Sequence, residues 1–102
     1  MILSLAQINP TIGDLEGNVA RILDFARRAM PSDLVVFPEL ALCGYPPKDL
    51  LLAEGFIAAC ERGAAEIAAG APAGVTLVFG TPLLAGRAGV HNGLVVCRGG
   101  KV

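Results

Sequence analysis

One acidic residue, Glu39, stands where the chain could place a general base. It follows the short apolar run Leu34–Phe37 and Pro38, and such runs between turn signals are typical of a buried strand. Ligands of open α/β sheets bind at the carboxyl ends of the strands. A carboxylate at that place, beside apolar walls, could take a proton from a nucleophile. The position alone also allows a surface glutamate, or one that caps a nearby backbone group.

The candidate nucleophiles are three cysteines. Cys43 lies four residues after Glu39, which makes it a weak candidate in the same loop. Cys60 falls on the apolar face of a predicted helix and Cys97 ends an apolar strand, so both are expected in the core. The chain has no CxxC pair and His91 is its one histidine, so a zinc site of Cys and His is not expected. Free thiols are typical of a reducing cytoplasm.

Four apolar runs are predicted to be the strands around these residues: Ile2–Ile8, Leu34–Phe37, Val75–Gly80 and Val90–Cys97. The first is apolar on both faces, which is typical of a central strand covered on both sides. Pro38 and the pair Thr81-Pro82 are expected to follow the ends of the second and third strands. Arg98–Lys101 is expected to be a hairpin turn, with Val102 opening a further strand.

Two amphipathic helices separate the first three strands. The first has Asp14 or Asn18 as its candidate cap and is expected to end at Pro31. The second is expected to begin near Asp49 and to end near Gly70. The apolar faces consist of Val19, Ile22, Leu23, Ala26 and Met30 in the first helix, and of Ala53, Phe56, Ile57, Cys60, Ala64, Ile67 and Ala68 in the second. The order β-α-β-α-β-β predicts an α/β fold with parallel strand pairs.

Composition excludes several classes of protein. Of 102 residues, 54% are apolar and 17% charged, so the chain is not a disordered one. Eight Lys and Arg against nine Asp and Glu, with no basic run, disfavour a nucleic-acid partner. No apolar run of about 18 residues could cross a membrane, and no basic residue precedes the first apolar stretch as a signal peptide requires. So apolar a short chain is expected to oligomerise or to belong to a larger unit.

Two stretches carry a family resemblance. Ala6–Asp14 and Asp33–Leu40, with its Pro-Glu-Leu step, resemble the nitrilase superfamily of carbon–nitrogen hydrolases. The continuation Ala41–Leu51, with Gly-Tyr-Pro-Pro-x-Asp-Leu-Leu, is similar to the N-terminal glutaminase domains of glutamine-dependent NAD synthetases. The resemblance implies that residues 1–102 are the N-terminal portion of such a domain. It also implies a partial αββα sandwich whose sheet is incomplete at the C-terminus.

The resemblance further implies a catalytic Glu–Lys–Cys triad, in which Glu39 takes the position of the general base. The family's lysine and nucleophilic cysteine have no counterpart among these 102 residues. Lys101 is interpreted as a turn residue and Lys48 as a solvated or capping one.

Two further residues are weaker candidates for the substrate pocket. Tyr45 follows Glu39 in its loop, although it could equally pack on the Pro46-Pro47 turn. Asn92 falls where the superfamily often carries an asparagine, and a buried hydrogen-bonding role is expected for it. Neighbouring His91 is expected to be a partly exposed strand residue.

The substrate and partners also follow from the resemblance. Glutamine would be hydrolysed, and the ammonia would pass to a synthetase domain that amidates deamido-NAD with ATP and Mg²⁺. This chain would then hold no cofactor or metal, would be cytoplasmic and inactive alone, and would join the rest of its domain, the synthetase domain and further copies in a homo-oligomer. The alternatives are a truncated stand-alone nitrilase-type amidase and a non-catalytic α/β module that self-associates.

Overall fold

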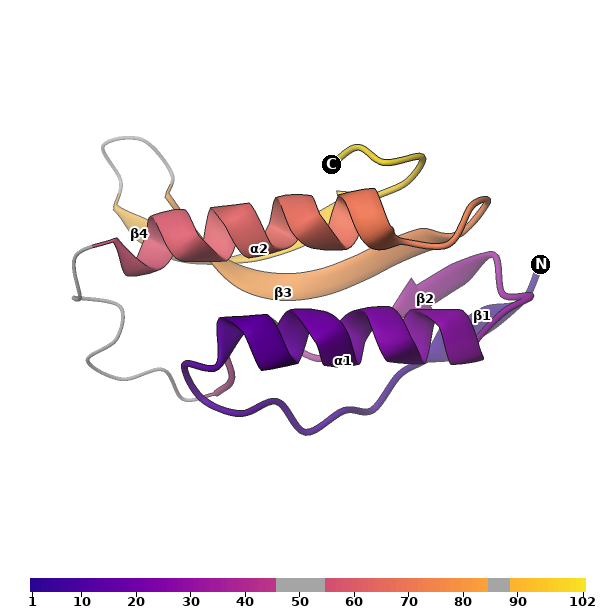
Figure 1. Ribbon diagram of the computed structural model, residues 1–102, viewed down its shortest axis with the longest axis horizontal. Coiled ribbons are helices and arrows are strands. Elements are labelled where there is room, and N and C mark those ends of the chain that lie inside the picture. The colour runs from indigo at the N-terminus through magenta and orange to yellow at the C-terminus, as the bar shows by residue number, and fades with distance from the viewer. Residues whose placement is uncertain (46–54, 85–88) are drawn as a thin grey trace.

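The described residues of the computed structural model, 1–45, 55–84 and 89–102, form one sheet with two helices (Figure 1). The strands are β1 (Leu3–Leu5), β2 (Leu34–Val36), β3 (Thr76–Leu84) and β4 (Val90–Cys97), and the helices are α1 (Leu15–Arg28) and α2 (Phe56–Gly70). The strands lie in the order β1-β2-β3-β4. The pairs β1–β2 and β2–β3 are parallel, and β3–β4 is antiparallel. The predicted α/β class and element order are therefore confirmed.

Both helices cover the same face of the sheet (Figure 1). Side chains on that face are fully buried, as Val35, Leu77 and Phe79 show. Directly paired residues of neighbouring strands point to the same side, so Val96, paired with Val78, and Leu94, two residues away, point to the opposite face. Leu94 is 64% exposed and Val96 54% exposed. The described residues thus form one helix layer and one sheet layer, with an open apolar face.

Strand β1 differs from the prediction. It covers Leu3–Leu5 instead of Ile2–Ile8, and it lies at the edge of the sheet among the described residues. Leu5 is 76% exposed, so the predicted central position with cover on both sides is wrong for this sheet. Its apolar pattern identifies a strand correctly, because a pattern reports which faces suit burial and not what covers them.

Strand β3 runs further than predicted. Thr81 and Pro82 lie inside it and pair with Gly93 and Asn92 of β4, whereas the sequence suggested that they follow its end. The register between β2 and β3 stops at Val78. Beyond that residue β3 has a ladder partner on one side alone among the residues that the structure describes, and an edge position of this kind tolerates a proline.

The first residues of the two helices follow a capping side chain in α1 and a glycine in α2. Asp14 caps α1 by accepting a 3.0 Å hydrogen bond from the backbone N–H of Gly17, which satisfies one free donor of the first turn. Asn18, the other candidate cap, is instead fully buried. Helix α2 begins at Phe56, after Gly55, and its predicted apolar face is buried at every described position except partly buried Phe56. Its predicted start near Asp49 lies outside the described residues.

The predicted turn at Arg98–Lys101 is confirmed. The backbone N–H of Arg98 donates to the carbonyl of Lys101 over 2.9 Å, and that of Lys101 donates back over 3.2 Å. Gly99 and Gly100 both have positive φ, 63° and 82°, as a two-residue type I′ hairpin requires. Lys101 is therefore a turn-flanking residue, as expected, and Val102 is exposed and unpaired with any described strand. No helix in the described ranges has the length and apolar character needed to cross a bilayer.

Candidate active site

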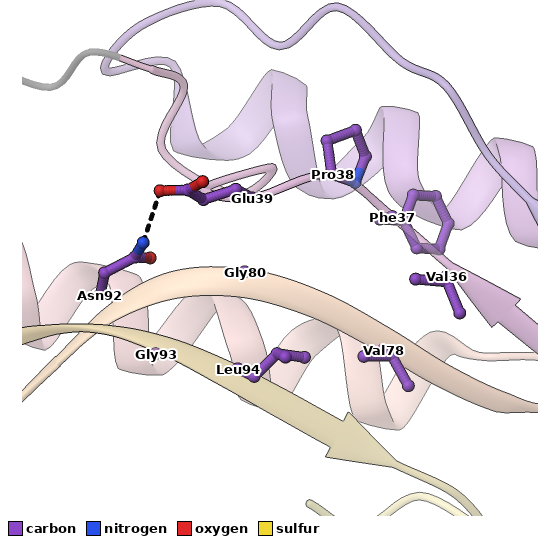
Figure 2. A pocket seen from close by; sticks show the side chains of 9 residues that line it. All are labelled: Val36, Phe37, Pro38, Glu39, Val78, Gly80, Asn92, Gly93 and Leu94. Atoms are coloured by element: carbon purple, nitrogen blue, oxygen red, sulfur yellow. Dashed lines mark hydrogen bonds between the residues drawn. The ribbon is translucent and has the colours of Figure 1, made fainter.

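A cleft of about 330 Å³ opens at the carboxyl end of β2, on the face away from the helices. Its floor is apolar and its rim holds one carboxylate and one amide. It is lined by Val36, Phe37, Pro38, Glu39, Val78, Gly80, Asn92, Gly93 and Leu94 (Figure 2). The position agrees with the rule that ligands of open sheets bind beyond the carboxyl ends of parallel strands.

Glu39 and Asn92 meet across this cleft. The side-chain Nδ2 of Asn92 donates a hydrogen bond to Oε1 of Glu39 over 2.5 Å, and Figure 2 shows the two side chains pointing toward one another. They lie 53 residues apart in the chain. The strand order brings them together, because Glu39 follows β2 while Asn92 lies on β4, one strand beyond β3. Both residues are exposed, so the expected hydrogen-bonding role of Asn92 is present without the expected burial.

The backbone of Glu39 lies directly on β3 at Gly80. A Cβ atom on Gly80 would lie 2.4 Å from the Leu40 nitrogen, which is closer than Cβ atoms approach other atoms, and 3.0 Å from the Glu39 Cα, which is a very tight contact. Two hydrogen bonds hold this contact: Phe37 N–H donates to the Val78 carbonyl over 2.8 Å and Leu42 N–H to the Gly80 carbonyl over 3.3 Å.

Leu40 adopts a backbone conformation that L side chains rarely take, with a φ of 50°. Such strain persists only where the surroundings enforce it. Here the buried Leu40 side chain and the β3 contact enforce the turn that directs Glu39 into the cleft.

Asn18, a buried residue of α1, holds the same turn by hydrogen bonds, and the sequence analysis did not predict this role. Its Nδ2 donates to the carbonyls of Leu42 and Thr11 over 2.9 and 2.8 Å, while its Oδ1 accepts from Thr11 N–H over 2.9 Å. The side chain thus joins helix α1, the loop after β1 and the turn after Glu39. The signal that could have found it was its position on the apolar side of α1, next to Val19, where an exposed cap would be out of place.

The three cysteines are buried, free thiols. Burial, with a smaller contribution from nearby Cys60, raises the pKa of Cys43 to about 11, and burial also raises the pKa of Cys60 and of Cys97. A buried thiol that resists ionisation is a poor nucleophile. The predicted core positions of Cys60 and Cys97 are confirmed, and the geometry opposes Cys43 as a nucleophile.

Two of the remaining candidates, Tyr45 and His91, are not among the described residues that line the cleft. Tyr45 is 68% exposed. His91 is an exposed residue of β4, as expected, and Lys48 lies outside the described residues. Among the described residues no group of three His, Cys, Asp or Glu side chains could hold a metal ion.

The family is established by comparison. Residues 2–99 match the carbon–nitrogen hydrolase family, and the chain belongs to that family. Its relatives include the glutamine-dependent NAD(+) synthetases of Xanthomonas campestris pv. campestris, 43% identical over 103 residues, and of Synechocystis sp., 43% identical over 81 residues. The alignments cover 98% and 78% of this chain but only 18% and 14% of those proteins. The chain therefore spans less than a fifth of the length of these relatives.

Solved structures support the same family by their fold. A glutamine-dependent NAD(+) synthetase from Cytophaga hutchinsonii superposes with a TM-score of 0.89 at 28% identity, over 98% of this chain and 17% of that one. An amidase from Nesterenkonia sp. superposes less closely, with a TM-score of 0.68 at 26% identity, over 92% of this chain and 36% of that one. The nitrilase-superfamily fold expected from the sequence is thereby confirmed.

Proposed function

We propose that this chain is the N-terminal part of the glutaminase domain of a glutamine-dependent NAD synthetase, with Glu39 as the general base. The observation that carries the proposal is the place of Glu39 in a family-matched fold. It is a carboxylate at the carboxyl end of β2, directed into a cleft of about 330 Å³. The similarity to the synthetases along 98% of the chain supports glutamine as the substrate class.

The chemistry proposed is covalent amide hydrolysis. A cysteine and a lysine from the rest of the protein complete the triad, because the described cysteines are buried in the core. Glu39 takes the proton of that cysteine, and the thiolate attacks the side-chain amide carbon of glutamine. The lysine stabilises the oxyanion, ammonia leaves with a proton returned by Glu39, and water releases glutamate from the thioester.

Ammonia then passes to the synthetase domain, which uses ATP and Mg²⁺ to amidate deamido-NAD. The open apolar face of the sheet supports the proposal that this chain is only part of the glutaminase domain, since the exposed Leu94 and Val96 need cover that the rest of that domain would provide. We place the protein in the cytoplasm, where deamido-NAD, ATP and reduced thiols occur together.

A stand-alone amidase is the second candidate. In a mutant of the Nesterenkonia amidase, acrylamide has added to the active-site cysteine by Michael addition, so one small amide reaches the active site of that protein. The closer superposition on the synthetase, with a TM-score of 0.89 against 0.68, favours glutamine. The sequence of the source gene beyond codon 102 separates the two, because a downstream synthetase domain is expected only for the first.

The decisive experiment compares two nitrogen sources in the full-length protein. Glu39→Gln keeps the shape of the side chain and removes the base, so glutamine-dependent NAD synthesis should fall by about 1,000-fold or more. Synthesis from added ammonium should stay within twofold, because it bypasses glutamine hydrolysis. Glu66→Gln, at an exposed position of α2, is the matched control and should change neither rate. Loss of both activities, or of neither, in Glu39→Gln would contradict the proposal.

A further inference from the structure

We propose that Asn92 is a positioning residue for the base: its amide fixes one oxygen of Glu39 so that the other is presented to the reacting thiol. This inference rests on the proposed function, and it assigns Asn92 a role that differs from contact with substrate. The observation behind it is the 2.5 Å hydrogen bond from Nδ2 of Asn92 to Oε1 of Glu39.

The two partners differ in how firmly they are held. Asn92 lies within the β3–β4 ladder, opposite Pro82. Its neighbour Gly93 lets the Leu83 side chain fold across the strand, at a place where a Cβ would lie 2.3 Å from Leu83 Cδ1. Glu39 lies in a turn, and its side chain has three rotatable bonds. The amide is therefore attached to the more regular backbone and through fewer rotatable bonds, and on this proposal it selects the orientation of the longer carboxylate side chain.

The two carboxylate oxygens of Glu39 have different surroundings, which suits a general base. Oε1 of Glu39 accepts from Asn92, whereas among the described residues no hydrogen bond engages Oε2. A neutral amide neither takes up the transferred proton nor repels the carboxylate, so it can hold Glu39 before and after proton transfer. Holding a reacting group in a productive orientation supplies much of an enzyme's rate enhancement, and a displacement of that group by 1 Å can lower the rate by about 100-fold.

Two variants of Asn92 in the full-length protein test this role. Asn92→Ala removes the donor, and we expect the kcat of glutamine hydrolysis to fall about 10- to 100-fold while KM stays within about threefold. Asn92→Asp keeps the shape but sets a second carboxylate against Glu39, and we expect a larger fall than for alanine because like charges repel. Ammonium-dependent synthesis should stay within twofold in both variants.

The controls separate orientation from folding. Asn9→Asp makes the same chemical change at an exposed asparagine and should leave kcat unchanged. Thermal melting and ammonium-dependent synthesis report whether each variant folds. If Asn92→Asp does not fold, Asn92→Ser replaces it: its shorter hydroxyl can still donate, so its rate should lie between those of wild type and Asn92→Ala.

The outcomes are distinct from those for the proposed function. A rise in KM at unchanged kcat would overturn this inference and make Asn92 a substrate contact. Greater activity in Asn92→Asp than in Asn92→Ala would overturn it as well, because shape alone would then matter. If Glu39→Gln abolishes glutamine use while Asn92→Ala keeps the full rate, only the role of Asn92 fails. If Glu39→Gln keeps glutamine use, the proposed function itself fails.

Discussion

The substitution Gly80→Ala should displace Glu39 while leaving its carboxylate unchanged, so it tests the position of the base independently of its chemistry. The added methyl group would lie 2.4 Å from the Leu40 nitrogen and 3.1 Å from the Glu39 carbonyl carbon. Ordinary contact begins at 3.4 Å, so β3 and the Glu39–Leu40 peptide must separate by about 1 Å. The atoms in conflict belong to the backbone, which cannot rotate away as a flexible side chain can.

The magnitude follows from this geometry. Crowding of this kind costs about 1–3 kcal/mol of stability, and the Leu42–Gly80 hydrogen bond of 3.3 Å would lengthen further. A shift of Glu39 by about 1 Å can lower the rate by about 100-fold, without any change in the acid or base present. We therefore expect glutamine-dependent synthesis to fall by about 100-fold and ammonium-dependent synthesis to stay within about twofold.

The assay measures both rates in the full-length protein, with thermal melting alongside. Gly70→Ala is the matched control, because a Cβ there meets the flexible Leu23 side chain at 2.9 Å far from the cleft, and it should leave both rates unchanged. If Gly80→Ala keeps glutamine-dependent synthesis within threefold of wild type while folded, the close approach of β3 does not position Glu39 and the reasoning is refuted.

Three further predictions concern the support of the site. Asn18→Ala should lower stability by about 3 kcal/mol, because it leaves buried backbone groups unpaired, and should increase deuterium uptake in the turn after Glu39; unchanged uptake would contradict this role. Asp14→Ala should cost about 1 kcal/mol by removing the cap, with faster amide exchange confined to the first turn of α1. Native Cys43, with its pKa raised from 9.0 to about 11, should react with iodoacetamide at pH 8 about 100-fold more slowly than in the unfolded chain, measured by peptide mass spectrometry. Because the unfolded chain loses this proton first, the free energy of unfolding should fall as pH rises from about 9 to about 11. Equal rates of alkylation in the native and unfolded states would refute burial of the thiol.

Local patterns predict the helices and most of the sheet well. The spacing of Val19, Ile22 and Ala26 identifies the buried side of α1, and the run at Leu34 identifies β2. The errors arise where tertiary context decides. Nothing local shows that β1 lies at an edge of the sheet. Nor does anything near Pro82 show that β3 loses one of its ladder partners there, which is what allows the strand to continue.

The sequence indicated both Glu39 and Asn92 as candidate site residues, but it did not predict the contact between them. Glu39 follows a buried strand within a family motif, so its place was foreseeable from its neighbours in the chain. The contact with Asn92 depends on the register of β3 with β4, and the need for Gly80 depends on a backbone approach of a few ångströms. Local composition does not encode either distance. The same holds for Asn18, whose three hydrogen bonds go to two residues, Thr11 and Leu42, in two other segments.

The open apolar face and the cleft occupy the same side of the sheet, and Leu94 belongs to both. On the proposed assignment, the layer of the domain that packs over Leu94 and Val96 would also enclose Glu39 and remove it from water, because Leu94 lines the same cleft. Glu39 would face water until that layer packs, so docking of the layer and the start of glutamine hydrolysis would be coupled.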